Sequence, residues 1–461
     1  MKLFSFITVI ACISLVSCAP SRMLNRSAKT LANDPALSMA HLGISIYDPV
    51  AGKYLCNYQG DKYFIPASNT KLATCYAAMK YLGDSLTGLR YDYESDSVIN
   101  VFPTGDPSFL HQDFSSQPVL HFLQHKGVRF YLQEGRWQTE PLGSGWSWND
   151  YTARYMAERS ALPVYGNLAH LYLDSSTLQD KSLMLHWHAQ PASFAHLLDT
   201  VRTISNIGQL DVTPLADGLA DFLVNRLIGS NEFVLENGGG KFTRTDIPFF
   251  TNNDSTAIEI LRKDHGIAIF KARQGSAAGL KKPRYLIHSQ PTDSLLRPMM
   301  HRSDNFFAEQ SLLMVSDAVL GVLSDDRIID TLLRSDLADL PQKPHWVDGS
   351  GLSRYNLFSP QDFVAILDRM RRDFGMDRIR NILPTGDEGT LSHYYKAEAG
   401  SLWAKTGSLS GVTSISGFVY TKKRQLLIFS VLVNNHQSST TDVRRAVERF
   451  IEGIVNGHPL R

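Results

Sequence analysis

Three short motifs supply the residue types that acyl transfer to a serine requires. In chain order, they are Ser68-Asn69-Thr70-Lys71, Ser303-Asp304-Asn305 and Lys405-Thr406-Gly407. A serine hydroxyl becomes an effective nucleophile when a neighbouring base removes its proton. Lys71 follows Ser68 by three residues, a spacing that places both side chains on one face of a helix. The first motif therefore predicts Ser68 as the nucleophile and Lys71 as its base.

The other two motifs predict the remaining parts of the reaction. Lys71 can act as a base when burial and a second cation lower its pKa, and Lys405 is the candidate for that cation. Ser303 is the candidate for passing the proton between Lys71 and the leaving amine. The backbone N–H groups of Ser68 and Ser408 are the candidates for stabilising the oxyanion.

The same motifs contain candidates for binding the substrate. Asn305 is expected to donate to a peptide carbonyl, and Lys405 and Thr406 are expected to hold a terminal carboxylate. Gly407 is expected to let the substrate approach, because a side chain there would block it. The strand edge that carries these residues can also pair with an extended peptide.

A strand pair and a helix are predicted around the first motif. Residues 41–48 alternate apolar and polar types, which predicts a strand, and residues 54–58 can pair with it. After Pro66, apolar residues recur at helical spacing, at Leu72, Cys75, Tyr76 and Met79. Ser68 is therefore expected at the N-terminus of a helix.

The elements around the later motifs predict the fold class. Residues 303–315 predict a helix, and the end of the chain predicts three strands followed by an amphipathic helix. The predicted bounds are 402–406, 412–420 and 425–434 for the strands, and 441–455 for the helix. Early and late helices flanking these strands predict a mixed α/β (α+β) fold, in which helices from both ends of the chain cover one sheet.

Residues 89–285 carry no acyl-transfer motif and predict an insertion of one or two subdomains. The catalytic domain is then formed by residues 18–88 and 286–461. Short strands are expected in the insertion at 98–102 and 128–132.

Two local patterns in the insertion are expected to be structural. Asn237-Gly238-Gly239-Gly240 predicts a turn or hairpin, because no Lys-Ser/Thr pair follows it as in a phosphate-binding loop. His186-Trp187-His188 predicts a strand with both rings on one face, because a metal site would require a third ligand at a convincing spacing.

The N-terminus predicts a lipoprotein signal peptide over residues 1–17. A positive start, Met1-Lys2, precedes an apolar stretch that is too short to span a bilayer. The stretch ends at Leu15-Val16-Ser17-Cys18, which resembles a bacterial lipoprotein signal with Cys18 as the acylated residue. A plain signal peptide without lipid is the alternative. Ala19 favours the outer membrane, so we expect a periplasm-facing lipoprotein of the cell envelope.

Bulk composition limits the partners and the crosslinks. The 46 basic and 45 acidic side chains give a formal net charge of +1. Nucleic-acid binding would require a strong basic excess or a clustered basic face, so no nucleic-acid partner is expected. Cys56 and Cys75 could form a disulfide in an oxidising compartment or remain buried thiols.

The motifs and their flanks resemble the low-molecular-mass class C penicillin-binding proteins, the S13 D-alanyl-D-alanine carboxypeptidase/endopeptidase family. A long insertion between the first two motifs is typical of that family. Further resembling segments are Pro66-Ala67, Phe306-Phe307-Ala308-Glu309, residues 348–354, Gly389-Thr390-Leu391, Gly105-Asp106-Pro107 and residues 145–150. The middle of the insertion, about residues 182–240, shows no such resemblance.

The resemblance implies a β-lactamase/transpeptidase-like serine acyl-transferase domain with a large mixed insertion. It implies cleavage of the D-Ala-D-Ala end, or of the D-amino-acid crosslink, of peptidoglycan stem peptides through an acyl-enzyme on Ser68. It also implies acylation of Ser68 by β-lactam antibiotics, and it implies no metal or organic cofactor.

Two other function classes remain as alternatives. A serine β-lactamase or esterase of the same fold uses overlapping motifs, but a β-lactamase requires a fast deacylation base and no evident glutamate motif of that kind is present. A non-catalytic peptidoglycan-binding protein with a dead site would not require the polar motif residues, which are intact here.

Overall fold

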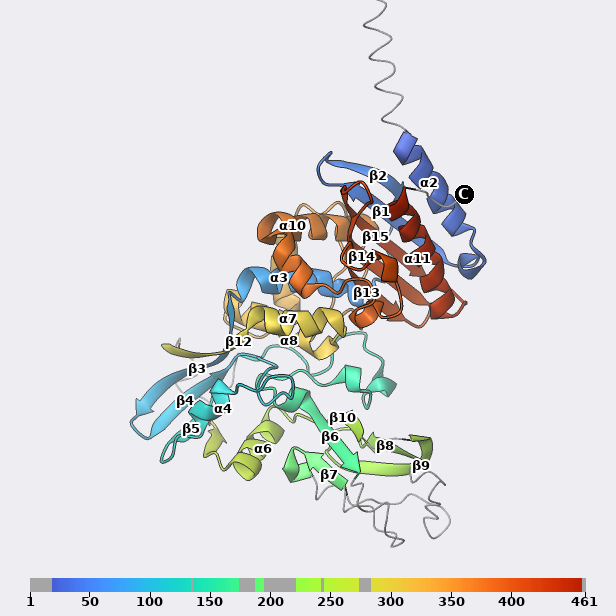
Figure 1. Cartoon of the computed structure of the whole chain (residues 1–461). Helices are drawn as coiled ribbons and strands as arrows, with labels where there is room; N and C mark the ends of the chain where they lie inside the picture. The colour runs from blue at the N-terminus through green and yellow to red at the C-terminus, as the bar shows by residue number, and fades with distance from the viewer. Residues whose placement is uncertain are drawn as a thin grey trace, which may run out of the picture. The chain divides into compact units, whose positions relative to one another are not determined.

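The first and last strands of the chain pair in one antiparallel sheet (Figure 1). The computed structural model describes residues 19–133, 136–173, 187–194, 221–241, 244–272 and 283–457. The strand order in this sheet is β13-β14-β15-β1-β2. The strand bounds are β1 His41–Asp48, β2 Lys53–Tyr58, β13 Leu402–Leu409, β14 Val412–Tyr420 and β15 Leu426–Asn434. All five strands were predicted within a few residues of these bounds.

Two compact units divide the chain. The first unit comprises Met1–Met79, Leu296–Asp304 and Ile329–Arg461, and the second comprises Lys80–Leu295 and Asn305–Ile328. The second unit therefore extends beyond the predicted insertion, residues 89–285. It includes the helix that begins at Asn305, the last residue of the second motif, so the chain leaves the first unit directly after Asp304.

Helices from both ends of the chain cover the sheet of the first unit, as the pattern predicts. Helices α2 (Ala19–Ala32) and α11 (Thr440–Asn456) contribute apolar side chains to one core with the strands. Helix α10 (Pro360–Ile382) contacts β1, β14 and β15. Ser359 caps α10 by accepting a hydrogen bond from the backbone N–H of Asp362, which satisfies one of the unpaired donors at the helix start.

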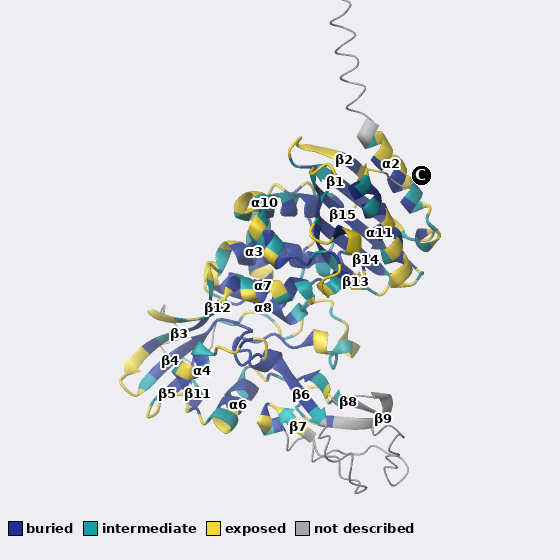
Figure 2. Cartoon of the chain, in the orientation of Figure 1, coloured by how far each residue is buried: buried dark blue, intermediate teal, exposed yellow. Residues whose placement is uncertain are grey.

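Helix α3 (Lys71–Tyr81) is a central helix of the first unit. Every residue from Lys71 to Met79 is buried, including the predicted apolar stripe, as the dark ribbon in Figure 2 shows. Cys75 on this helix and Cys56 on β2 are separate buried thiols and form no disulfide with each other. Burial raises the pKa of the Cys56 thiol to about 12, so this group stays protonated and unreactive at neutral pH.

The second unit is built on a five-stranded mixed sheet with the order β11-β5-β4-β3-β12. Pairs β4–β5 and β5–β11 are parallel, and the remaining pairs are antiparallel. The bounds are β3 Ser85–Ser95, β4 Val98–Pro103, β5 Arg129–Leu132, β11 Ile269–Lys271 and β12 Tyr285–Pro291. The strands predicted at 98–102 and 128–132 correspond to β4 and β5.

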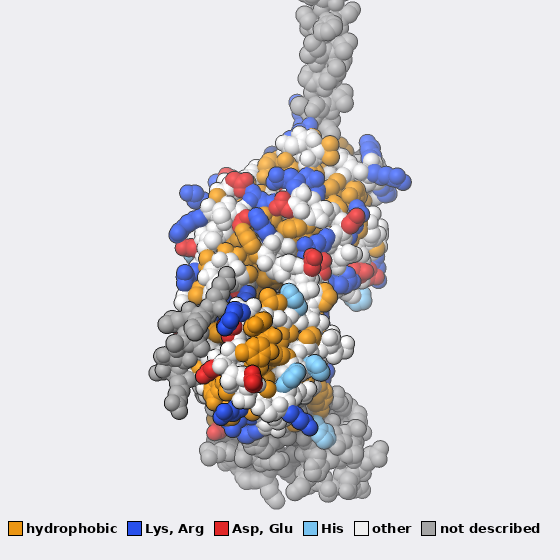
Figure 3. Space-filling model, turned by 90° about the vertical axis from the view of Figure 1, so that its left-hand side faces the viewer, with side chains coloured by type: hydrophobic (Ala, Val, Ile, Leu, Met, Phe, Trp, Pro, Cys, Tyr) orange, Lys and Arg blue, Asp and Glu red, His pale blue; other side chains and the backbone are white. Residues whose placement is uncertain are grey.

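Among the described residues, two smaller sheets and three helices complete the second unit. The sheets are β10-β6-β7 and β8-β9. The bounds are β6 Leu168–Leu173, β7 Trp187–Gln190, β8 Asp221–Arg226, β9 Phe233–Lys241, β10 Arg244–Pro248, α4 Pro118–Leu123, α6 Ser255–His265 and α8 Asn305–Leu320. Helices α7 (Thr292–His301) and α9 (Asp325–Arg334) contain residues of both units. Figure 3 shows hydrophobic side chains gathered on one face of the second unit.

The glycine run at 237–240, predicted as a turn or hairpin, lies in a strand of the antiparallel β8–β9 pair and not in its turn. The run lies inside β9, where Asn237 pairs with Phe222 while Lys241 pairs with the neighbouring Asp221. The three glycines are therefore an irregularity of the strand, the use of glycine that a β-bulge favours. The second pattern is only partly visible: Trp187 and His188 lie in β7, whereas His186 lies outside the described residues.

The predicted signal peptide and Cys18 lie outside the described residues, and α2 begins at Ala19. Within the described ranges, no helix is long and apolar enough to cross a membrane. No cluster of three or more His, Cys, Asp or Glu side chains that could hold a metal ion occurs in those ranges.

Candidate active site

The first motif lies where a 3₁₀ turn runs into α3. Residues Ala67–Thr70 form this turn, and Lys71 opens the helix. The Nζ of Lys71 donates a hydrogen bond to Oγ of Ser68 at 2.9 Å, and Lys71 is fully buried. The structure thus places Ser68 at a helix start, as predicted, with a lysine amine on its hydroxyl.

A loop from another part of the first unit fixes the position of Lys71. Its Nζ also donates to the backbone oxygen of Ser350 at 2.8 Å. Gly351 follows with φ +81, and a Cβ there would lie 1.9 Å from the backbone oxygen of Ala67. Glycine is therefore required for this loop to approach the nucleophile turn. In the sequence, residues 348–354 stand out only through the family resemblance, and no local pattern indicates this role.

The buried carboxylate of Asp348 holds this loop in shape. It accepts from the backbone N–H of Gly351 at 2.7 Å and of Ser353 at 2.6 Å. The side-chain amide of Asn356 donates to it at 2.8 Å. These bonds fix the carbonyl of Ser350 that faces Lys71, so Asp348 acts on the site through the backbone.

Ser303 of the second motif and Lys405 of the third motif meet in the first unit. Lys405 on β13 donates from Nζ to Oγ of Ser303 at 2.8 Å and to the backbone oxygen of Thr406 at 2.5 Å. Ser303 itself has φ 59, a left-handed conformation that cannot continue a helix. The helix predicted over 303–315 therefore starts later, at Asn305, and Ser303 stands in the turn between α7 and α8.

Lys405 is buried in a positively charged environment. Burial, the charge of Lys71 and the charge of Arg444 lower the pKa of Lys405 well below its usual value. Two ammonium groups in one buried site disfavour each other's charged form. The sequence predicts a lowered pKa for Lys71, with Lys405 as the second cation, whereas the shift that the structure resolves is that of Lys405.

Gly407 packs against the nucleophile turn. A Cβ at Gly407 would lie 2.7 Å from the backbone nitrogen of Ser68 and 2.8 Å from the backbone oxygen of Pro66. We predicted glycine here because a side chain would block the substrate. The structure gives a different reason, because a side chain would first collide with the backbone that carries the nucleophile.

Two residues outside the predicted site, Thr390 and Arg444, support Thr406. The Thr406 hydroxyl donates to Oγ1 of Thr390 at 2.8 Å, and Arg444 on α11 donates to the backbone oxygen of Thr390 at 2.5 Å. The guanidinium of Arg444 also stacks on Tyr394, 3.9 Å from the ring centroid. Arg444 thus places a positive charge beside the strand that is predicted to hold a carboxylate. Thr390 was visible only as part of a resembling segment, and nothing in the sequence pointed to Arg444.

Two predicted residues remain, Ser408 and Asn305. Ser408 lies on β13 in the first unit, and Asn305 lies in the second unit. Ser408 is exposed on β13, which stands at one end of the strand order among the described strands. Asn305 opens α8 in the second unit, where its side-chain amide donates to the backbone oxygen of Tyr155 at 3.1 Å. The role of Asn305 in binding a substrate carbonyl stays a prediction.

Comparison with known proteins identifies the family. Residues 24–453 match the model of the D-Ala-D-Ala carboxypeptidase 3 (S13) family. The chain belongs to this family. It is 24% identical over 437 residues to the D-alanyl-D-alanine carboxypeptidase DacB of Haemophilus influenzae, covering 86% of this chain and 85% of the relative. It is 25% identical over 452 residues to the D-alanyl-D-alanine carboxypeptidase of Actinomadura sp. (strain R39), covering 90% of this chain and 81% of the relative.

Solved structures confirm the fold. The crystal structure of penicillin binding protein 4 (dacB) from Haemophilus influenzae superimposes with a TM-score of 0.68 at 18% identity, covering 93% of this chain and 99% of that chain. The predicted family and the predicted fold, a penicillin-binding acyl-transferase domain with an insertion, are therefore confirmed. The S13 chain described here is a serine-type D-Ala-D-Ala carboxypeptidase.

Proposed function

We propose that this enzyme cleaves the D-Ala-D-Ala end, or the D-amino-acid crosslink, of peptidoglycan stem peptides through an acyl-enzyme on Ser68. The observation that carries the proposal is the 2.9 Å hydrogen bond between the buried amine of Lys71 and the Ser68 hydroxyl. This distance lies within the range that direct proton transfer requires. The carboxypeptidase names of the S13 relatives support the substrate class.

The acylation step uses the two lysine–serine pairs. Lys71 takes the proton of Ser68 as Oγ attacks the carbonyl carbon of the scissile bond, which gives a tetrahedral oxyanion. The C–N bond then breaks, and the leaving amine receives a proton through Ser303. We assign Lys71 as the base because its amine contacts the Ser68 hydroxyl, whereas the amine of Lys405 contacts the hydroxyl of Ser303. The products of this step are an ester on Ser68 and a free amine.

Deacylation repeats the same chemistry with water. Lys71 accepts a proton from a water molecule that attacks the ester carbonyl, and Ser68 leaves as its hydroxyl. In both steps the backbone N–H groups of Ser68 and Ser408 are the proposed oxyanion donors. Lys405 and Thr406 are the proposed anchors of the terminal carboxylate. The negative charge of the bound carboxylate would favour the charged form of Lys405, and it would oppose the lowering of the Lys405 pKa by burial.

Acylation by penicillin tests the nucleophile. The related structure of penicillin binding protein 4 was solved in complex with a β-lactam, with a TM-score of 0.63 at 17% identity. Intact-mass measurement after penicillin treatment should show one adduct on the protein, and Ser68→Ala should show none. An adduct that survives this change would refute the assignment. A transient adduct would favour a β-lactamase, and no adduct at all would favour a non-catalytic binding protein.

Digestion of purified muropeptides, read by mass spectrometry, defines the reaction. Loss of a terminal D-alanine from monomers would show carboxypeptidase action. Conversion of crosslinked dimers to monomers would show endopeptidase action. Release of neither product by a protein that penicillin acylates would refute the proposed substrate and leave an esterase of the same fold.

We propose a periplasm-facing, outer-membrane lipoprotein as the cellular form. The support is the sequence Leu15-Val16-Ser17-Cys18 followed by Ala19. Several acyl chains on one cysteine would anchor the protein stably. Cys18→Ser should release the protein from the membrane fraction or leave it unprocessed. Unchanged fractionation and mature mass would refute the anchor.

A further inference from the structure

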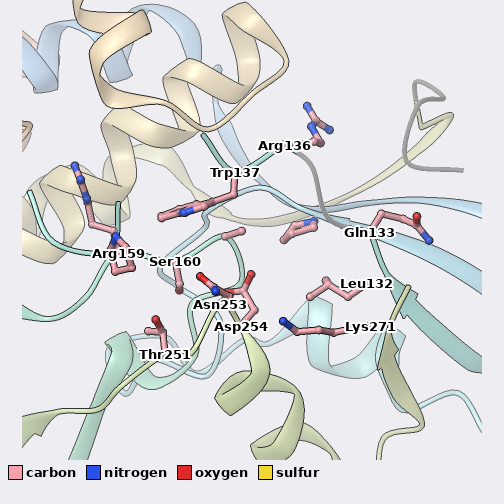
Figure 4. Close-up of a pocket in the computed structure, with 13 residues that line it drawn as sticks. Leu132, Gln133, Arg136, Trp137, Arg159, Ser160, Thr251, Asn253, Asp254 and Lys271 are labelled. Carbon is pink, nitrogen blue, oxygen red and sulfur yellow. The ribbon is translucent and has the colours of Figure 1, made fainter. Parts of the chain in front are cut away.

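A small cavity of the first unit is lined by Thr406 on β13 and by Arg444 on α11, on the side of the sheet that α11 covers. Its volume of about 10 Å³ leaves room for about one water molecule, so no substrate group fits between the strand and the helix there. The cavity of the second unit is much larger, about 400 Å³, but no residue of the three motifs lines it (Figure 4). The small cavity lies directly behind the predicted carboxylate anchor.

The loop at 387–395 connects the anchor strand to α11. The hydroxyl of Thr406 donates to Oγ1 of Thr390 in this loop at 2.8 Å, and Arg444 donates to the backbone oxygen of Thr390 at 2.5 Å. The guanidinium of Arg444 lies 3.9 Å from the ring centroid of Tyr394 in the same loop. A guanidinium that stacks on a ring and donates to a carbonyl is held in one orientation. Arg444 therefore fixes the part of the loop that contacts Thr406.

Two further residues of α11 hold the same loop. Arg445 donates to the backbone oxygen of His393 at 3.1 Å. Glu448 accepts from the backbone N–H of Tyr395 at 2.6 Å. A support that is fixed before the substrate arrives lowers the entropic cost of binding. The helix thus provides a rigid base for Thr390.

The other side of the loop packs against the end of α7. Gly389, next to Thr390, has φ +51, and a Cβ there would lie 2.5 Å from the backbone oxygen of His301. Glycine is therefore required for this close approach. His301 ends α7 and precedes Ser303 by two residues. The loop is packed between α11 and the turn that carries Ser303.

The two threonine hydroxyls can exchange donor and acceptor roles, because each has one proton and two lone pairs. Thr406 donates to Thr390 in the structure. An ionised carboxylate only accepts hydrogen bonds, so the proton of Thr406 would turn toward a bound carboxylate. Thr390 would then donate to Thr406, and no proton would leave its own oxygen. The pair can therefore bind a carboxylate while both hydroxyls stay hydrogen-bonded.

The positive charge of Arg444 also acts on the lysine of the anchor. Burial lowers the pKa of Lys405 most, followed by the charge of Lys71 and then by that of Arg444. A cation that is close enough to disfavour the charged form of Lys405 is also close enough to attract an anion held there. These two effects of Arg444 on carboxylate binding have opposite signs.

We propose that Arg444 and Thr390 are positioning residues for the carboxylate anchor. Arg444 holds Thr390 in place, and Thr390 keeps the hydroxyl of Thr406 in the orientation that a terminal carboxylate requires. The inference rests on the proposed function, in which Thr406 and Lys405 bind this carboxylate. It extends the region that selects the substrate to the loop at 387–395 and to α11.

Acylation of the full chain by benzylpenicillin and by its methyl ester tests the proposal. The ester lacks the negative charge that the anchor binds, so a defect of folding alone should slow both reactions equally. Arg444→Met should slow acylation by benzylpenicillin about tenfold and should change acylation by the ester less than about threefold. Intact-mass measurement over time gives the acylation rate for both compounds.

Variants of Thr390 test the hydroxyl contact separately from the charge. Thr390→Val removes the partner of the Thr406 hydroxyl but keeps Arg444, and it should slow the reaction with benzylpenicillin about threefold to tenfold more than that with the ester. Thr390→Ser keeps a hydroxyl and should recover the preference for benzylpenicillin to within about twofold of wild type. Arg449→Met removes a surface ion pair with Asp34 on the same helix and should leave both rates unchanged. Thermal unfolding shows whether each variant folds, and Thr390→Val gives a second test if Arg444→Met does not.

Three outcomes would overturn the proposal alone. The first is an equal loss of rate with both compounds in Arg444→Met, which would indicate a structural role only. The second is a faster reaction of Arg444→Met with benzylpenicillin, because Arg444 would then act mainly by opposing the charge of Lys405. The third is a normal preference in Thr390→Val, which would show that the hydroxyl contact has no role. If wild type reacts equally with both compounds, or with neither, the proposed anchor or the proposed acyl-enzyme is wrong, and this proposal is wrong as well.

Discussion

Buried cations serve different purposes in the two units of this enzyme. In the second unit, Arg159 lies between two carboxylates, Glu309 and Asp325. In the first unit, Lys405 lies against a serine hydroxyl and a backbone oxygen, with Lys71 and Arg444 near enough to lower its pKa. A buried charge that is neutralised stabilises one arrangement of the chain. A buried charge among other cations is poised to lose its proton or to bind an anion.

The difference shows that burial of a charged side chain is not by itself a functional signal. Burial lowers the pKa of Lys405 most, and the charges of Lys71 and Arg444 lower it further, whereas the carboxylates beside Arg159 favour the charged form of that side chain. Arg159 and Lys405 are both almost fully buried, but only the neighbours of Lys405 disfavour its charged form.

Removal of the base should have the largest effect. Lys71→Ala should slow acylation by penicillin by about 10²–10⁴-fold, the range that general-base catalysis contributes. Stopped-flow or gel-based labelling with a fluorescent penicillin measures this rate. Lys80→Ala, which changes an exposed lysine of the same helix, is the matched control and should label at the normal rate. Acylation of Lys71→Ala within threefold of wild type would show that another group is the base.

Removal of the buried cations Arg159 and Lys405 should have different effects on the free energy of unfolding. Arg159→Met leaves two carboxylates without their cation, and it should lower the free energy of unfolding by about 3–5 kcal/mol. Lys405→Met removes a charge that the site disfavours, and it should leave stability unchanged or raise it. Urea denaturation of both variants gives the comparison. Equal destabilisation by both would mean that Lys405 is also a structural charge, and the contrast would be lost.

If Lys405 anchors the terminal carboxylate, its removal should lower kcat/KM more for a substrate that has this group than for one that lacks it. Lys405→Ala should weaken the reaction of a peptide with a free terminal carboxylate by about 1.5–3 kcal/mol more than that of its amidated analogue. The amidated peptide controls for the contact of Lys405 with Ser303, which both substrates require. If kcat/KM falls equally for the two peptides, Lys405 is not the anchor.

The close packing at Gly407 predicts a smaller effect. Gly407→Ala should destabilise the first unit by about 1–3 kcal/mol, because the new methyl group meets the backbone of Ser68 and Pro66. Acylation should slow as the nucleophile turn shifts. If the variant has normal stability and labels with penicillin at the normal rate, the nucleophile turn can accommodate the methyl group without a change in the active site.

The pH dependence of stability should give the smallest but most specific signal. The pKa of Lys405 in the folded protein lies below its unfolded value of 10.5. Between these two values the unfolded chain binds more protons, so stability rises with pH across this window. The stability advantage of Lys405→Met over wild type should therefore be greatest below the folded pKa and shrink as pH approaches 10.5. An advantage that does not change with pH would contradict the lowered pKa.

Much of the catalytic unit could be predicted because its signals are local. The apolar–polar pattern of residues 41–48 and the three late strand patterns gave the strands of the central sheet. The spacing of Ser68 and Lys71 alone placed their side chains on one helical face, and the structure has them 2.9 Å apart. Patterns of this kind repeat every two or four residues, so a single segment carries them.

The errors and omissions share one physical cause. The glycine run at 237–240 has the composition of a turn, but pairing with β8 made it part of a strand. The helix predicted to start at Ser303 begins at Asn305, because Ser303 takes a left-handed turn toward Lys405, 102 residues later in the chain. Ser350 and Arg444 act through contacts with distant residues, for which no local pattern exists.

The sequence by itself determined the chemistry, the family and the order of the motifs, since these depend on residue types and short spacings. Tertiary structure decided which groups surround each charge. It placed Ser350 on Lys71, Arg444 beside Lys405, and the Cβ position of Gly407 against Ser68. It also assembled the cavity of the second unit from segments between residues 103 and 271. The pKa of a buried group depends on every charge within several ångströms, and only the folded chain specifies those neighbours.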